Sequence, residues 1–183
     1  MKIANRAFTV IELVIVFLIV GIVAAISVAQ MPDMEGMRIT QLAYKIQSDI
    51  RYAQRLAMQL QRKTAVQFSA TNNNYSIYIE NTYGANDWNA NVKAKNPIAP
   101  QSDFDVQFSS DEFKGVLISE AFFNVANYTL VFDRNGAPYA MEFTTPATLS
   151  ALSGTGRVVL NTNRKYILVQ PTTGRVNVQN TYP

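Results

Sequence analysis

The chain has 183 residues, enough for one folded domain with an appendage, and a hydrophobic content of 48% that can supply a core. It contains no histidine and no cysteine, which excludes imidazole acid–base chemistry, cysteine nucleophiles and the usual zinc sites. The formal net charge of +3 is too small to indicate a partner by itself.

The N-terminus consists of a basic head, residues 1–7, followed by a long apolar run. The head carries one lysine and one arginine, and residues 13–31 contain no charge. As a helix, that uncharged run would be about 28 Å long, close to the ~30 Å hydrocarbon core of a bilayer. We therefore expect residues 8–31 to form a transmembrane helix, with the head in the cytoplasm and the C-terminus outside.

Three interpretations of this N-terminus are open: an uncleaved signal anchor, a secretory signal cleaved after Ala29, and the precursor of a subunit that assembles through its helix. Glu12 discriminates between them, because it interrupts the start of the apolar run. A carboxylate in a spanning helix costs about 2–3 kcal/mol at the centre and less near an end. Only in a helix that assembles with copies of itself can this carboxylate pair with a positive group of a neighbour. Glu12 therefore favours the third interpretation, the precursor of an assembling subunit.

The segment Ala7-Phe8-Thr9-Val10-Ile11-Glu12 resembles the cleavage motif of type IV prepilins, in which a small residue precedes Phe-Thr and a spaced glutamate. Glu12 is the fifth residue counted from Phe8, as the family pattern requires. The resemblance implies that prepilin peptidase cuts between Ala7 and Phe8 and methylates the Phe8 amine. Glu12 would then neutralise that amine in an adjacent subunit and set the axial register. The family usually has glycine in place of Ala7, which implies slower processing.

The same resemblance implies where the protein is found and what it contacts. Residues 1–7 would be a leader peptide, and residues 8–31 an assembly helix as well as a membrane span. The subunit would reside in the inner membrane as a single-pass protein, with a cytoplasmic N-terminus and a periplasmic C-terminal domain. An inner-membrane assembly platform would then build it into a pilus or pseudopilus, where its partners are the N-terminal helices of other subunits.

Residues 32–63 are predicted to continue the helix with one apolar face. Apolar residues recur there at steps of three or four. They are Ile39, Leu42, Ala43, Ile46, Ile50, Ala53, Ala57 and Leu60. We expect one helix from near Thr9 to Arg62. Its first half would be apolar on every side, and its second half would pack against a domain through its apolar face. Pro32 and Gly36 mark either a flexible joint or a simple kink, and both interpretations stay open.

Residues 64–183 are predicted to form a periplasmic or extracellular β domain. Three pairs of strand-like segments flank turn-like sequence, which predicts three hairpins and a further final strand. The segments are 64–68 with 75–79, 128–132 with 139–143, 157–160 with 166–169, and 175–178. Residues 81–103 are predicted to be a long loop. The expected fold class is α+β and pilin-like, with six to eight mostly antiparallel strands packed on the amphipathic half of the long helix.

Three later segments resemble the H-type minor pseudopilins, the GspH/FimT-like subfamily. They are residues 46–57, with the pattern Asp-hydrophobic-Arg-x-Ala, residues 131–136 and residues 173–176. This resemblance implies a minor subunit, at or near the tip of a type IV pilus or type II secretion pseudopilus, rather than the bulk of the filament. The sequence leaves open which of these machines it serves.

No catalytic constellation is present, so we expect neither an enzyme nor a cofactor or metal site. Paired acids occur at Asp103 with Asp105 and at Asp111 with Glu112, and we favour solvated loop side chains over metal ligands for them.

The end of the chain is basic. No acidic residue follows Glu142, and the cations in that stretch are Arg157, Arg164, Lys165 and Arg175. Cations capture phosphates, and some FimT-like minor pilins bind DNA for uptake. The alternative function is therefore a DNA-binding minor pilin of a natural-transformation uptake pilus, which we favour less than a structural subunit because four cations at strand ends are few.

Overall fold

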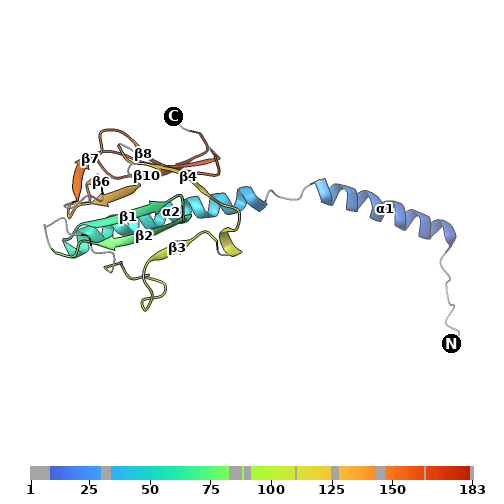
Figure 1. The fold of residues 1–183 in the computed structure, drawn as a ribbon. Helices are drawn as coiled ribbons and strands as arrows, with labels where there is room; N and C mark the ends of the chain where they lie inside the picture. Colours follow the sequence, from blue (N-terminus) through green and yellow to red (C-terminus); the bar gives the residue numbers. More distant parts are fainter. Residues whose placement is uncertain are drawn as a thin grey trace. The chain divides into compact units, whose positions relative to one another are not determined.

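The structure is a computed structural model that describes residues 9–29, 34–82, 88, 92–109, 111–124, 128–142, 147–162 and 164–181 (Figure 1). It divides into two compact units, Met1–Met34 and Glu35–Pro183. Among the described residues, all those of the buried core belong to the second unit.

The first unit contains the helix α1 (Val10–Ala29). Thr9 caps its N-terminus, because the backbone amide of Glu12 donates a hydrogen bond to Thr9 Oγ1 at 3.3 Å. The amide of Leu13 donates to the Thr9 carbonyl oxygen at 3.2 Å, which begins the helical hydrogen-bond pattern. A threonine cap three residues before a glutamate is the spacing of a capping box, so the local sequence accounts for where α1 begins.

The prediction of one long helix with a membrane-spanning first half is wrong. The structure has two helices, α1 and α2 (Met34–Leu60). Among the described residues, no helix combines the length and apolar character that crossing a membrane requires. The sequence between the two helices contains Pro32, which has no amide hydrogen to donate and disfavours helical backbone in the residue before it. Pro32 itself lies outside the described residues.

The helix α2 is amphipathic, as predicted. Its buried residues are Ile39, Leu42, Ala43, Ile46, Ile50, Ala53 and Ala57. The predicted apolar face ends one turn early, because Leu60 is 44% exposed. The helix closes just there: Gln61 adopts a positive φ of 53°, and its side-chain amide donates to the Met58 carbonyl oxygen at 2.8 Å.

The larger of two sheets has six strands within the described residues. Their order across the sheet is β3-β2-β1-β5-β6-β7, and every pairing is antiparallel. The strands are β1 (Thr64–Ser69), β2 (Asn74–Ile79), β3 (Asp105–Gln107), β5 (Thr129–Phe132), β6 (Pro138–Glu142) and β7 (Thr148–Ala151). A short 3-10 helix, η1 (Asp111–Phe113), follows β3.

The smaller sheet has four described strands in the order β10-β9-β8-β4, again antiparallel throughout. The strands are β4 (Ile118–Phe122), β8 (Gly156–Leu160), β9 (Lys165–Val169) and β10 (Val176–Gln179). The fold is therefore α+β, with ten described strands where six to eight were predicted.

The three predicted hairpins are confirmed as β1–β2, β5–β6 and β8–β9, and the predicted final strand is β10. The β5–β6 turn depends on Asp133, whose Oδ1 accepts hydrogen bonds from the amides of Asn135 and Ala137 at 2.9 and 2.8 Å. Such an aspartate-centred turn is what the sequence Asp-Arg-Asn-Gly predicts. The strands β3, β4 and β7 were not predicted.

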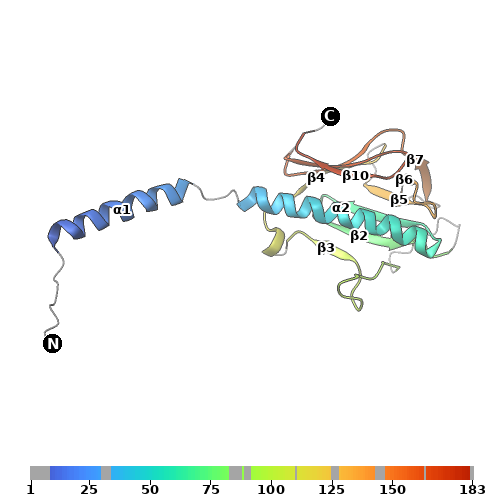
Figure 2. The ribbon, with the colours of Figure 1, turned by 180° about the vertical axis from the view of Figure 1, so that it is seen from behind.

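The core lies between α2 and the sheets. Figures 1 and 2 show α2 running along β1 and β2. Thr64 Oγ1 on β1 donates to the Ala53 carbonyl oxygen of α2 at 2.8 Å. One continuous apolar cluster joins α2 to both sheets, with Phe68, Phe108, Phe123 and Phe132 among its largest fully buried side chains.

Candidate functional site

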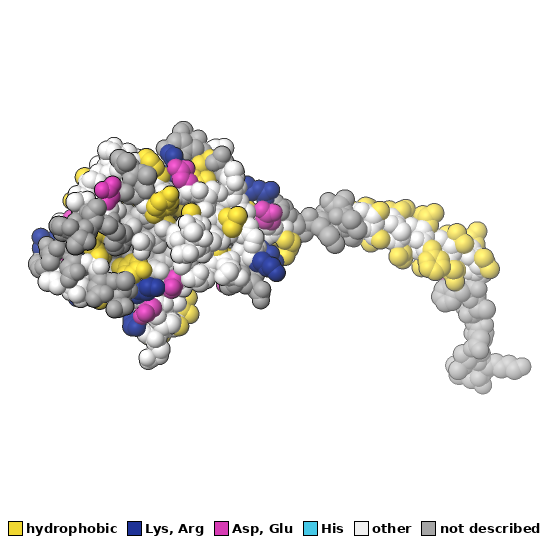
Figure 3. Space-filling view, viewed as in Figure 1, with side chains coloured by type: hydrophobic (Ala, Val, Ile, Leu, Met, Phe, Trp, Pro, Cys, Tyr) yellow, Lys and Arg dark blue, Asp and Glu magenta, His cyan; other side chains and the backbone are white. Residues whose placement is uncertain are grey.

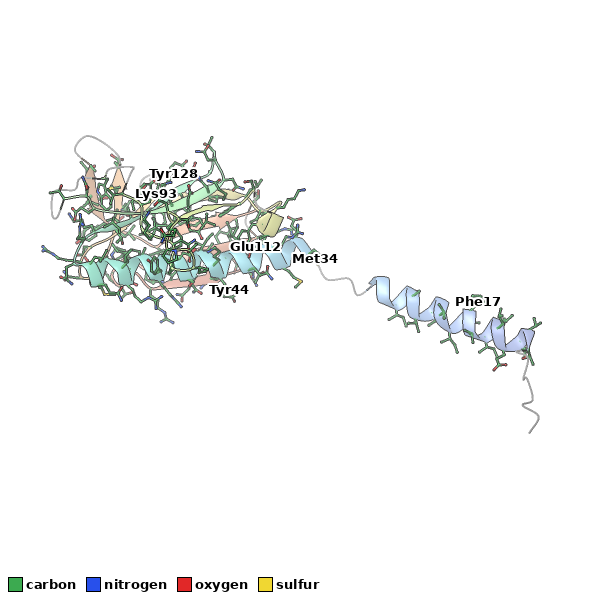
Figure 4. All side chains as sticks on the ribbon, turned by 90° about the horizontal axis from the view of Figure 1, so that it is seen from below. Phe17, Met34, Tyr44, Lys93, Glu112 and Tyr128 are labelled. Carbon is green, nitrogen blue, oxygen red and sulfur yellow. The ribbon has the colours of Figure 1, made fainter. Side chains whose placement is uncertain are left out.

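The apolar surface of α1 is exposed around the whole helix. Thirteen large apolar side chains between Val10 and Ile26 have exposed fractions of 50% to 83%. Figure 3 shows them covering α1, and Figure 4 shows Phe17 projecting from it. A helix in the core of a globular domain hides such residues, and a surface helix carries them on one stripe only. An apolar surface on every side is suited to contact with other apolar helices.

Glu12 lies in the first turn of α1, and it is exposed. A carboxylate there interacts favourably with the unpaired amides at the helix start, by about 0.3–1 kcal/mol. The structure thus gives Glu12 a local role at the capped end of α1, beside the intersubunit role implied by the resemblance to prepilins.

The other residues of the predicted N-terminal sites are placed only in part. Ala7 and Phe8, the predicted cleavage and methylation residues, lie outside the described residues, as does Pro32. Gly36 lies inside α2, where its carbonyl oxygen accepts a hydrogen bond from Thr40 Oγ1 at 2.7 Å. The helix is therefore continuous through Gly36, and a joint at this residue stays a prediction.

The predicted basic tail does not form one patch. Arg157 forms a salt bridge with Glu120, at 2.8 Å between Nη2 and Oε1, and lies over the ring of Phe122 at 4.8 Å. Its guanidinium is thus held within the small sheet between β8 and β4.

The next two cations of the tail also have partners. Arg164 pairs with Glu35 at 3.6 Å, and the Lys165 ammonium donates to Asn180 Oδ1 at 2.5 Å. Both contacts are at the surface, where such pairs contribute about 0–1 kcal/mol.

Arg175 instead faces two arginines of α2, across a groove of about 500 Å³ that we call the arginine groove. Its lining residues are Gln47, Ser48, Arg51, Gln54, Arg55, Thr173, Arg175 and Val176. The α2 residues recur at helical spacing on one exposed face, and the opposite wall is the turn that leads into β10. Three guanidinium groups from segments more than 100 residues apart in sequence therefore line one depression.

Two glutamines of α2 fix the opposite wall of the arginine groove. The Gln47 side-chain amide donates to the Val176 carbonyl oxygen at 2.8 Å. The Gln54 amide donates to the carbonyl oxygens of Gly136 and Thr173, at 2.8 and 3.0 Å. Because these are backbone acceptors, the position of the wall depends little on the side chains it carries.

Gly174 allows the turn to approach α2 this closely. It has a positive φ of 65°, and a Cβ atom there would lie 2.8 Å from both Gln54 Nε2 and Phe132 Cε1. Its amide donates to the Gln170 carbonyl oxygen at 3.0 Å, which closes the turn. A glycine at this position sets the width of the groove.

The arginine groove has uncompensated positive charge. No acidic side chain lines it among the described residues, and Arg51, Arg55 and Arg175 form no salt bridge there. The acid nearest in sequence, Asp49, is occupied elsewhere: its Oδ2 accepts hydrogen bonds from Lys45 Nζ at 3.1 Å and from the Tyr75 hydroxyl at 2.5 Å.

Of the three arginines, Arg51 is partly engaged and the other two are not. Its Nη2 donates to the Val176 carbonyl oxygen at 3.0 Å, which orients the guanidinium and leaves its other donors available. Arg55 and Arg175 are exposed and donate no side-chain hydrogen bond within the described chain. The groove therefore combines one anchored cation with two free ones.

Sequence reasoning missed Arg51 and Arg55 as site residues, because charged residues off the apolar stripe resemble any solvated helix surface. A signal was nevertheless present. The segments 46–57, 131–136 and 173–176, which resemble the H-type motifs, meet at Gln54 through its bonds to Gly136 and Thr173.

One of the two pairs of acids, Asp103 with Asp105, is accounted for by lysines. Asp103 pairs with Lys95 at 2.7 Å, and Asp105 pairs with Lys93 at 3.1 Å. The Lys95 ammonium lowers the pKa of the Asp103 carboxyl by its hydrogen bond and its charge. Within the described chain, no group of three or more acidic side chains is arranged to hold a metal ion.

Comparison with protein-family models, with curated proteins and with solved structures found no match.

Proposed function

We propose that this chain is a minor pilin or pseudopilin, processed by prepilin peptidase and assembled into a type IV pilus or a type II secretion pseudopilus, at or near the tip. The observation that carries the proposal is the exposure of apolar side chains on every side of α1. A domain of this size does not need such a helix for its own core, whose described residues all lie within residues 35–183.

The magnitudes support assembly through α1. Burying a large apolar side chain completely contributes about 1.5–3 kcal/mol, so half-burial of thirteen contributes on the order of 10 kcal/mol. An isolated helix of this length is only marginally stable in water, which adds to the advantage of a partner. The natural partners are the equivalent helices of other subunits, because they present the same surface.

Apolar burial alone does not select one axial register, since a uniformly apolar helix can slide along another. Glu12 is the one charged side chain in the described part of α1. In the proposed filament its carboxylate pairs with the methylated amine of Phe8 in an adjacent subunit. A mismatched register would leave that carboxylate among apolar side chains, at a cost of several kcal/mol. Burial drives the assembly, and Glu12 selects the register.

The alternative, DNA capture by the basic tail, has less support. Three of its four cations, Arg157, Arg164 and Lys165, already contact other side chains. A structural subunit therefore remains the better proposal.

The test is the intact mass of the protein extracted from cells with and without prepilin peptidase. We expect a chain that begins at methylated Phe8 only when the peptidase is present. A chain beginning at Met1 in both cells would mean that the peptidase does not cut it, and one beginning at Gln30 would mean cleavage at a secretory signal site. Either of these two results would refute the proposal.

A further inference from the structure

We propose that the arginine groove binds phosphate groups. Arg51 and Arg55 on α2 and Arg175 before β10 form its cationic lining. The groove lies within the second compact unit, so phosphate binding there does not depend on assembly through α1.

The chemistry of the lining favours phosphate over other anions. Arginine donates in a planar fork that matches two oxygens of a phosphate, and three such forks surround one depression. Gln47, Gln54, Ser48 and Thr173 add neutral polar groups between the cations. A phosphate bound there would meet no lining carboxylate among the described residues and so no like charge to repel it.

The groove is also pre-organised. Arg51 is held by the Val176 carbonyl oxygen, while Gln47 and Gln54 hold the opposite wall through backbone acceptors. Three unneutralised cations on one small surface repel each other. Because an anion relieves that repulsion and the wall need not move to receive it, binding incurs little cost of reorganisation.

The lining also limits what carries the phosphate. No aromatic side chain lines the groove among the described residues. Base stacking therefore has no platform here. The ligand is recognised through its phosphates, whether these belong to a small phosphate compound or to the backbone of a nucleic acid.

The experiment uses the full chain, kept in solution by a non-ionic detergent, with two probes. Isothermal titration calorimetry measures the affinity of the chain for inorganic pyrophosphate. Fluorescence anisotropy measures its affinity for a short labelled DNA duplex at low ionic strength. The test variant is Arg55→Gln with Arg175→Gln, because neither side chain donates a described hydrogen bond, so the fold should persist.

The matched control is Lys95→Gln with Lys114→Gln, which removes the same net charge at exposed positions outside the groove. A hydrogen bond to a charged group contributes enough that each lost arginine should weaken binding about tenfold. We therefore expect the groove variant to bind about a hundredfold more weakly than the parent, and the control variant within about twofold of it. For the duplex, the dependence of affinity on salt should also become shallower by about one unit of slope per lost phosphate contact.

The two probes distinguish between a small phosphate compound and a nucleic acid backbone as the ligand. Groove-dependent binding of pyrophosphate alone supports a site for small phosphate compounds, and groove-dependent binding of both probes supports a site for a nucleic acid backbone. Equal losses in the groove and control variants would overturn the proposal, because net charge would then explain the binding. Absence of binding to both probes by the parent chain would overturn it as well. Circular dichroism of each variant checks that its secondary structure is intact.

Discussion

Replacing Gly174 by alanine tests how closely the turn before β10 must approach α2. Gly174 combines a positive φ of 65° with close neighbours on α2 and β5. The substitution adds one methyl group and leaves every charge and hydrogen-bonding group of the sequence unchanged. Its effect on stability therefore reports on backbone conformation and packing alone.

The structure allows the magnitude to be estimated in two parts. An alanine in the left-handed region costs roughly 1–2 kcal/mol. The new Cβ would also lie 2.8 Å from Phe132 Cε1 and from Gln54 Nε2. Phe132 is fully buried and has no space to move into, and Gln54 can move only by breaking its bonds to Gly136 and Thr173. Overpacking of this kind costs about 1–3 kcal/mol, and each lost hydrogen bond about 1 kcal/mol. We expect a total loss of about 3–5 kcal/mol.

The assay is urea unfolding followed by circular dichroism, on a fragment of residues 35–183 that contains the whole described core. Gly115→Ala is the matched control, since Gly115 also has a positive φ, of 90°, but a Cβ there would have no neighbour within 4 Å. We expect this control to lose only the conformational part, about 1–2 kcal/mol.

The difference between the two variants isolates the packing contribution. Equal losses for Gly174→Ala and Gly115→Ala would refute the reasoning, because they would mean that the turn is not held tightly against α2. The wall of the arginine groove would then be movable, and its description as pre-organised would be wrong.

Two further predictions concern titration and assembly. Burial, followed by the charge and hydrogen bond of Asp49, raises the pKa of Tyr75 well above its usual value of 10.0. The unfolded chain releases this proton near pH 10 while the folded chain retains it, so the free energy of unfolding should fall above about pH 10, by about 1.4 kcal/mol per pH unit. Tyr75→Phe should remove that contribution in urea unfolding, and an unchanged slope would contradict the assignment. Glu12→Gln should abolish filament assembly, measured as subunit recovered in sheared filaments, because glutamine still suits a capped helix start but carries no charge. Glu35→Gln, the same change outside α1, should assemble normally, and normal assembly of both variants would leave Glu12 only its local role.

The elements that the sequence predicted well are those with local signals. The β5–β6 hairpin is specified by Asp133 and Gly136 in its turn, and the buried face of α2 by its three-to-four residue spacing. Each signal lies within a few residues of the structure it determines, so no tertiary information was needed.

The missed strands lack such signals. The alternation in β4 is broken by a register shift between Ile118 and Glu120, and β7 exposes nearly all of its residues. The three residues of β3 are too few to show a period. These segments become strands because they pair with the edges of neighbouring strands. That pairing depends on tertiary structure and not on the local sequence.

The arginine groove could not be predicted from the sequence, because its residues come from segments that only the tertiary structure brings together. Arg175 was identified from the charge of the tail, but its companions Arg51 and Arg55 lie on a helix more than 100 residues earlier. Arg157, Arg164 and Lys165 looked equivalent to Arg175 in sequence, and only the three-dimensional pairing with Glu120, Glu35 and Asn180 distinguishes them.

The bonds between α2 and β10 also bear on how the chain folds as it is made. Gln47 and Val176 are 129 residues apart, so the first helix of the second unit is anchored by its last described strand. During synthesis or export from the N-terminus, α2 emerges early and the β1–β2 hairpin forms beside it. The bonds from Gln47 and Arg51 to the Val176 carbonyl oxygen have to wait until residue 176 has followed. Forming this contact closes a loop of more than 100 residues, which carries a large entropy cost. A chain cut short before β10 lacks Val176 as the acceptor for Gln47 and Arg51 and has no complete arginine groove, so the finished surface of the second unit forms only after residue 176 has been made.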